Sequence, residues 1–99
     1  PQVLRFNAVT APQSYAEIAA CAFPDLAGLS PQAAATAFAE AMADLSKRCG
    51  LQQRLRDLGI KRGALPMLAG DAMNQTRLLV NNPRTVTQAD ALAIYEAVW

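Results

Sequence analysis

Apolar residues in the first half of the chain recur at the three- and four-residue spacing of amphipathic helices. One helix is expected over residues 12–22, with a proline in its first turn, where the missing amide hydrogen costs little. A longer helix is predicted from Pro31 to Cys49, with Ser30 as its N-cap and Gly50 ending it in the left-handed conformation. We expect its apolar seam to consist of four residues, Phe38, Met42, Leu45 and Cys49.

The middle of the chain predicts shorter elements. A helical turn over residues 52–58 is stopped by Gly59, and another helix is expected over residues 64–74. Gly70 inside that helix indicates either close packing against a second helix or backbone close to a ligand. Residues 77–80 have the composition of a strand but no evident pairing partner, so we expect an extended connector there.

The end of the chain combines a turn with a capped helix. Residues 81–84 (Asn-Asn-Pro-Arg) have the composition of a turn closed by asparagine side chains. Thr87 is expected to cap the final helix, with Asp90 in the reciprocal position of a capping box. Apolar residues fall on two neighbouring faces of this helix: Ala91, Ile94 and Val98 on one, and Leu92, Tyr95 and Trp99 on the next. A helix with so wide an apolar arc is expected to make contacts on two sides.

These patterns predict an all-α protein, a compact bundle of four to five helices forming a single domain over residues 1–99. Alanine supplies much of the 53% hydrophobic content. Because alanine favours helices but buries little surface per residue, we expect a thin core and a surface suited to a partner.

The net charge of +1 gives no strong preference for nucleic acid or a membrane. Six of the nine basic residues nevertheless fall within residues 47–62, together with a single acid, Asp57. Two interpretations remain open: a surface facing phosphate or polynucleotide, and helix ends whose cations favour the negative end of the dipole. No aromatic residue alternates with these charges to stack on bases, so we expect no nucleic-acid partner.

The two cysteines, Cys21 and Cys49, lack the spacing of a metal or redox motif and are expected to be buried core residues. Their use fits a reducing compartment, and we expect a cytoplasmic protein. No apolar run approaches the roughly 18 residues of a membrane span, so no membrane partner is expected.

The chain lacks the residues of the common catalytic arrangements. It contains no histidine, which excludes serine–histidine and cysteine–histidine pairs. Glu40 and Asp44 are the one carboxylate pair at helical spacing, and their place on the polar face favours a solvated surface pair over acid–base or metal chemistry. From these residues alone, we expect no catalytic, cofactor-binding or metal-binding site in this chain.

Four motifs together resemble the carboxy-terminal part of the iron-containing alcohol dehydrogenases, the group III enzymes with a dehydroquinate synthase-like fold. They span the chain in the order and spacing of that family: residues 1–7 (Pro-x-Val-Leu-Arg-Phe-Asn), 55–60 (Leu-Arg-Asp-Leu-Gly-Ile), 65–69 (Leu-Pro-x-Leu-Ala) and 82–87 (Asn-Pro-Arg-x-Val-Thr). Residues 1–7 also lack a cap and are expected to be the end of a helix.

The resemblance implies a two-domain parent enzyme that uses NAD(P) and Fe²⁺, or sometimes Zn²⁺, to interconvert small alcohols and aldehydes. In that family the metal ligands, an aspartate and three histidines, precede the segment matched by Pro1, so this chain would hold neither metal nor cofactor. It would contribute packing and a wall of the substrate pocket, formed by Leu78 and Leu79. Some relatives have cysteine at the position of Leu78, and leucine would make that wall apolar.

Alternative interpretations stay open. As a carboxy-terminal fragment, the chain would be inactive by itself and would associate with the missing amino-terminal part of the enzyme or with itself. The parent could also be a maleylacetate reductase, although residues 82–87 favour the alcohol dehydrogenases. A different class is a stand-alone helical module for protein interaction or oligomerisation, which the alanine-rich helices would suit.

Overall fold

The computed structural model describes all residues from Pro1 to Trp99. It contains six α-helices, α1 (Gln2–Ala8), α2 (Pro12–Ala22), α3 (Pro31–Arg48), α4 (Leu65–Met73), α5 (Thr76–Leu79) and α6 (Gln88–Ala97). Three short 3₁₀ helices, η1 (Pro24–Leu26), η2 (Leu55–Leu58) and η3 (Arg62–Ala64), lie between them, and no strand is present. The all-α class predicted from the sequence is confirmed, with six α-helices where four to five were expected.

The chain divides into two compact units, unit 1 (Pro1–Leu51) and unit 2 (Gln52–Trp99). Each unit has its own buried residues and its own pairs of packed helices. The prediction of a single domain over residues 1–99 stays a prediction, and the units are described one at a time below.

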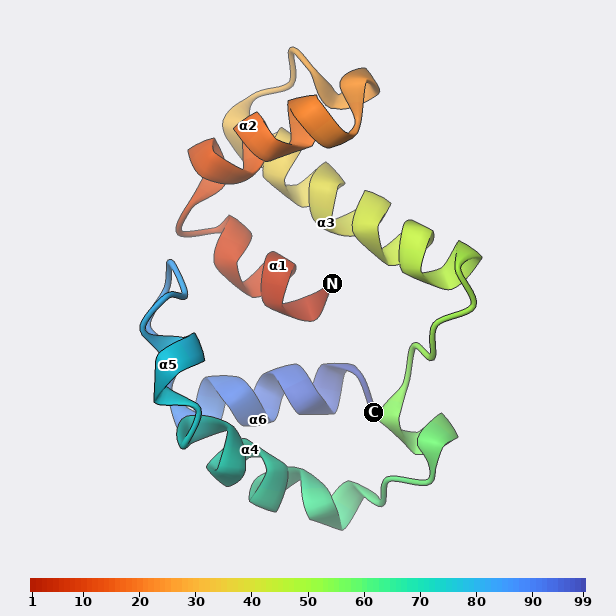
Figure 1. The fold of residues 1–99 in the computed structure, drawn as a ribbon, viewed down its shortest axis with the longest axis vertical. Helices are drawn as coiled ribbons and strands as arrows, with labels where there is room; N and C mark the ends of the chain where they lie inside the picture. The colour runs from red at the N-terminus through yellow and green to blue at the C-terminus, as the bar shows by residue number, and fades with distance from the viewer. The chain divides into compact units, whose positions relative to one another are not determined.

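Unit 1 is organised around α3, against which α1 and α2 both pack (Figure 1). Its buried apolar residues are Ala8, Ala19, Ala34, Ala35, Phe38 and Ala39. Phe38 lies at the centre of an aromatic group, with ring centroids 6.1 Å from Tyr15 and 6.0 Å from Phe23. Small alanine side chains allow helices to approach closely, so three aromatic rings provide most of the volume in this core.

The turn from α1 to α2 depends on a buried polar residue, Asn7, which is 2% exposed. Its backbone carbonyl accepts hydrogen bonds from the amides of Thr10 and Ala11, at 2.9 and 3.0 Å. Its side-chain Nδ2 donates to the hydroxyl of Tyr15 at 3.2 Å. Because a buried amide without partners would be destabilising, these bonds fix where α1 ends and α2 begins.

The expected start of α3 at Pro31 is confirmed, and the helix ends at Arg48, one residue before the predicted end. The Ser30 side chain accepts a hydrogen bond from the Ala33 amide at 3.4 Å. At the other end Gly50 has φ +73°, a conformation that favours glycine. The amides of Gly50 and Leu51 donate to the carbonyls of Lys47 and Ser46, each at 3.0 Å, which is the pattern of a Schellman motif.

The prediction that both cysteines are buried is wrong, because Cys21 and Cys49 are exposed. Cys21 lies two residues beyond Ala19, the buried residue of α2, and two residues turn the helix by about 200°. Cys49 is the C-cap of α3, and the expected apolar seam does not reach it, since Leu45 is already 37% exposed. The buried face of α3 lies nearer its amino-terminal half, at residues 34–39.

Unit 2 is built on the contact between α4 and α6, which lie side by side in Figure 1. Leu65 and Ala69 of α4 and Ala91 of α6 are its buried apolar residues. A β-carbon built at Gly70 would lie 3.6 Å from the Nε2 atom of Gln88. The neighbour of Gly70 is therefore a side chain of α6, as the close-packing interpretation of this glycine expects.

The prediction of an extended connector over residues 77–80 is wrong. Residues 76–79 form the short helix α5 instead. The Gln75 carbonyl accepts hydrogen bonds from the amides of Leu78 and Leu79, and the Asn81 side chain donates to the Arg77 carbonyl at 2.9 Å. The bond from Asn81 satisfies one backbone carbonyl at the end of the helix. The strand-like composition of the segment did not reveal this contact.

The final helix begins as predicted, at a Thr87 N-cap with a complete capping box. Of its apolar residues Ala91 is buried, and five more, Leu92, Ile94, Tyr95, Val98 and Trp99, are half-buried on or directly after the helix. None of the helices in this structure combines the length and the hydropathy that a membrane crossing requires.

Candidate functional site

The two residues predicted to form a substrate-pocket wall lie on α5 but differ in exposure. Leu78 is 62% exposed, whereas Leu79 is half-buried. Adjacent residues on one helical turn point about 100° apart, so they cannot share one surface fully. The structure therefore gives the two leucines different surroundings within unit 2.

Leu79 lines a shallow groove of about 540 Å³. The groove is bounded by the end of α4, by α5 and by the turn that follows, through Met73, Thr76, Leu79, Val80, Asn82, Thr85 and Val86. Four of these lining residues are apolar, and the hydroxyls of Thr76 and Thr85 and the amide of Asn82 are its hydrogen-bonding groups.

The turn beside this groove is held by hydrogen bonds of its own. The Asn82 side chain donates to the Arg84 carbonyl at 2.5 Å. The Thr87 amide and hydroxyl both donate to Asp90 Oδ2, at 2.9 and 2.6 Å, and the Asp90 amide donates to the Thr87 hydroxyl at 3.2 Å. The bonds from Thr87 lower the pKa of Asp90, with a smaller contribution from the charge of Arg84. Asp90 is therefore a capping carboxylate, whose Oδ2 accepts both hydrogen bonds from Thr87.

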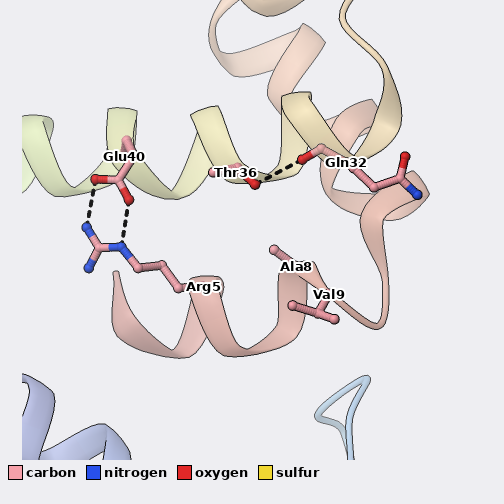
Figure 2. Close-up of a pocket in the computed structure, with 6 residues that line it drawn as sticks. All are labelled: Arg5, Ala8, Val9, Gln32, Thr36 and Glu40. Atoms are coloured by element: carbon pink, nitrogen blue, oxygen red, sulfur yellow. Dashed lines mark hydrogen bonds and ion pairs between the residues drawn. The ribbon is translucent and has the colours of Figure 1, made fainter.

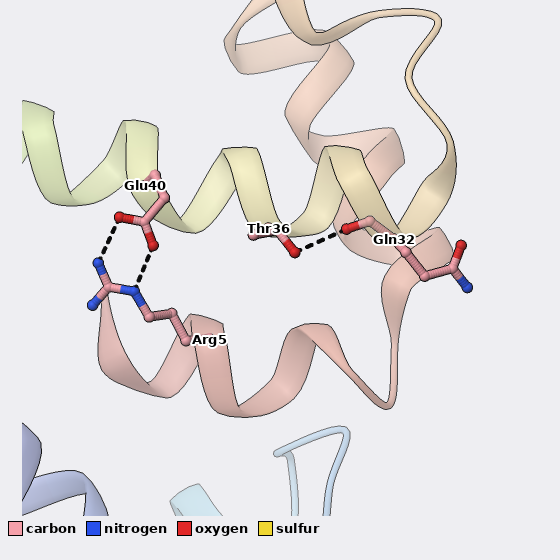
Figure 3. A network of polar contacts seen from close by, with 4 residues as sticks. All are labelled: Arg5, Gln32, Thr36 and Glu40. Atoms are coloured by element: carbon pink, nitrogen blue, oxygen red, sulfur yellow. Dashed lines mark hydrogen bonds and ion pairs between the residues drawn. The ribbon is translucent and has the colours of Figure 1, made fainter.

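Unit 1 contains a second cavity, of about 360 Å³, between α1 and α3 (Figure 2). It is lined by Arg5, Ala8, Val9, Gln32, Thr36 and Glu40. At one end the guanidinium of Arg5 binds the carboxylate of Glu40 through two bonds, Nε to Oε1 at 2.7 Å and Nη2 to Oε2 at 2.8 Å. Figure 3 shows this pair next to the hydroxyl of Thr36, which donates to the Gln32 carbonyl at 3.0 Å.

The pair between Arg5 and Glu40 raises the pKa of the guanidinium and lowers that of the carboxyl, in each case mainly through the hydrogen bonds between them. Sequence reasoning assigned Glu40 to a solvated pair with Asp44, but each acid has its own cation. Glu40 binds Arg5, and Asp44 lies 2.9 Å from Arg48. The spacing of residues within α3 could not reveal a partner on α1, 35 residues away.

Two basic residues of unit 2 lie over an aromatic ring that the sequence did not place beside them. The guanidinium carbons of Arg56 and Arg62 lie 5.8 and 5.6 Å from the ring centroid of Trp99. The Trp99 indole Nε1 donates to the Ile60 carbonyl at 2.9 Å. Trp99 therefore joins the end of the chain to the segment between η2 and η3.

A model of the carboxy-terminal region of the Fe-containing alcohol dehydrogenase family matches residues 1–99. The chain belongs to the Fe-containing alcohol dehydrogenase family. Its curated relatives include lactaldehyde reductase from Escherichia coli K12, 31% identical over 99 residues, and 1,3-propanediol dehydrogenase from Klebsiella pneumoniae, 34% identical over 95 residues. These matches cover 100% and 96% of this chain, but only 26% and 24% of the relatives. The chain thus spans about a quarter of their length.

A solved structure of 1,3-propanediol oxidoreductase supports the same assignment. It aligns over 100% of this chain and 26% of its own length, with a TM-score of 0.91 and 32% sequence identity. The structural comparison and the sequence match therefore assign the chain to the same family. The resemblance inferred from the four motifs is confirmed.

The family is defined by iron, but the residues of this chain do not fit an iron site by themselves. The sequence contains no histidine. In the structure no three cysteine, aspartate or glutamate side chains lie together as metal ligands would. No catalytic step is therefore assigned to a metal held by these residues.

Proposed function

We propose that this chain is the helical carboxy-terminal region of an NAD(P)-dependent, iron-type alcohol dehydrogenase that interconverts small alcohols and aldehydes. The observation that carries the proposal is the match of all residues 1–99 to the family, together with relatives named for lactaldehyde and 1,3-propanediol. In such an enzyme the cofactor transfers a hydride, and the protein binds and orients the substrate.

The role proposed for these residues is packing and one wall of the substrate pocket. Leu78 is the better wall residue, because its side chain is 62% exposed in unit 2 and therefore free to meet a ligand or the rest of the enzyme. Leu79 lines the groove of unit 2, and its proposed role is to support that wall from within the unit. NAD(P) and Fe²⁺ or Zn²⁺ would be held by residues outside this chain, in a cytoplasmic enzyme.

The isolated chain is proposed to be inactive. The test compares the purified 99-residue chain with an enzyme that carries it as its carboxy-terminal region. Oxidation of NADH or NADPH is followed with lactaldehyde, with short aliphatic aldehydes and with maleylacetate. Turnover of aldehydes by the longer enzyme, and none by the isolated chain, is the expected result. Turnover of maleylacetate alone would contradict the alcohol dehydrogenase assignment, and turnover by the isolated chain would contradict its supporting role.

A stand-alone interaction module is the alternative from another class. Such a module would form a defined oligomer at low concentration, whereas a region of a larger enzyme would associate with its missing part. Sedimentation of the purified chain over a range of concentrations distinguishes the two. A single stable oligomer that does not bind the rest of the enzyme would favour the module.

A further inference from the structure

Part of the basic segment singled out in the sequence lies in unit 2, around η2 and η3. It contains four cations, Arg54, Arg56, Lys61 and Arg62, and one acid, Asp57. That acid is engaged by Arg54, whose Nε lies 3.1 Å from Asp57 Oδ2. The remaining three basic side chains are exposed and form no ion pair in the structure.

Two of these unpaired cations are gathered at one aromatic ring. The guanidinium carbons of Arg56 and Arg62 are both within 6 Å of the Trp99 centroid, at 5.8 and 5.6 Å. The ring is held in place because its only N–H donates to the Ile60 carbonyl at 2.9 Å. A backbone hydrogen bond from the Leu55 amide to the Val98 carbonyl, at 2.8 Å, also joins the start of η2 to the residue before Trp99.

This arrangement places two positive charges close together, and neither of them forms an ion pair. The negative face of the indole offsets part of their repulsion, which is why both guanidinium groups can lie over it. Their N–H donors are left free, since neither group donates to a carboxylate or a carbonyl. A guanidinium presents five donors in a planar fork that matches the oxygens of a phosphoryl group.

We propose that Arg56, Arg62 and Trp99 form a binding site for the phosphoryl group of a small molecule, with Lys61 adding to the local charge. From the sequence alone a phosphate-facing surface stayed open as one of two interpretations, and no aromatic residue alternated with the charges. The fold brings the missing aromatic residue, Trp99, to the charges from 37 positions beyond Arg62. A polynucleotide is less suitable, because one ring cannot stack on successive bases.

The test uses the fluorescence of Trp99, which is the single tryptophan of the chain and therefore reports this site alone. The 99-residue chain is titrated with inorganic pyrophosphate, and with sodium chloride at matched ionic strength. Pyrophosphate is expected to give a saturable change that chloride does not reproduce. Arg56→Gln and Arg62→Gln should each weaken binding roughly tenfold, since a charge-assisted bond contributes about that factor.

Arg77→Gln is the matched control, because Arg77 is an exposed arginine of the same unit that makes no contact with Trp99. Circular dichroism of each variant confirms that the helices are retained. Equal affinity in Arg62→Gln and in the parent chain, no saturable change, or an equal response to chloride would overturn the proposal. Tighter binding of a single-stranded oligonucleotide than of pyrophosphate would also overturn it, in favour of a polymer ligand.

Discussion

The two units bury their apolar residues in different ways. In unit 1 a single long helix, α3, carries most of the buried residues, and both other α-helices pack against it. In unit 2 the longest α-helix has 10 residues, and the packing of α4 on α6 is supplemented by a capping box and by the hydrogen bond from Trp99 to Ile60. Unit 1 is thus held mainly by a continuous packed surface, and unit 2 depends more on individual polar contacts.

The largest expected effects come from removing the main core side chain of each unit. Phe38→Ala should destabilise unit 1 by about 3–5 kcal/mol, and Leu65→Ala should destabilise unit 2 by about 2–5 kcal/mol, because each leaves a cavity. Phe38 is 7% exposed and Leu65 is 1% exposed. Urea unfolding is followed by circular dichroism for the first variant and by Trp99 fluorescence for the second.

Exposed apolar residues provide the controls for these two variants. Val9 is 80% exposed in unit 1, and Met67 is 61% exposed on α4 in unit 2. Alanine at either position should change the free energy of unfolding by no more than about 0.5 kcal/mol. A core variant no less stable than its control would refute the assignment of that core.

Trp99→Phe should destabilise the chain by about 1–3 kcal/mol, because it leaves the Ile60 carbonyl without its donor. Tyr95→Phe is the control, since it also removes a polar atom from an aromatic residue near the end of the chain, and the Tyr95 hydroxyl makes no hydrogen bond. Urea unfolding followed by circular dichroism measures both. An equal effect of the two substitutions would mean that the indole N–H does not stabilise unit 2.

The helix caps predict a smaller difference between the units. Thr87→Ala should lower the free energy of unfolding by about 1 kcal/mol. Ser30→Ala should lower it by less, because the bond from the Ala33 amide to the Ser30 side chain is long, at 3.4 Å.

The stabilisation by the Thr87 cap should also depend on pH. The pKa of Asp90 is lowered in the folded state, so its stabilisation is complete above the ordinary carboxyl pKa and is lost as the pH falls through the lowered value. Unfolding of Thr87→Ala should be less sensitive to acid, and equal sensitivity would contradict this linkage.

The smallest effect is expected at the exposed pair of Arg5 and Glu40. Glu40→Gln should destabilise unit 1 by less than Thr87→Ala destabilises unit 2, because solvent and salt screen exposed ion pairs. The pKa of Glu40 is lowered, so its contribution is present above the ordinary carboxyl pKa and is lost on acidification. Unfolding measured at low and high salt tests this, and an effect that persists undiminished at high salt would contradict it.

The sequence predicted best what depends on neighbouring residues. The Ser30 and Thr87 caps and the left-handed Gly50 and Gly59 are local devices, and each is present. The pairs between Arg5 and Glu40 and between Trp99 and Ile60 join residues 35 and 39 positions apart. No local pattern encodes such distant contacts, so they could not be predicted before the fold was known.

The errors have equally specific causes. The segment that forms α5 was misassigned because its composition is ambiguous, and the side chain of Asn81 completes the helix from outside it. Cys21 was assigned to the core because cysteine is commonly buried, although its place on α2 faces away from Ala19. For the pocket wall, no pattern in the sequence distinguishes Leu78 from Leu79, and only the fold shows which of the two is exposed.

Leu78→Ala in an enzyme that carries this chain tests the proposed pocket wall most directly. The measurement is kcat/KM across a series of straight-chain aldehydes, with Met67→Ala, equally exposed at 61%, as the control. We expect Leu78→Ala to shift the preference toward longer or bulkier substrates, because it removes apolar volume from the wall, and we expect the control to leave the profile unchanged. An unchanged profile in Leu78→Ala would contradict the claim that this chain lines the substrate pocket.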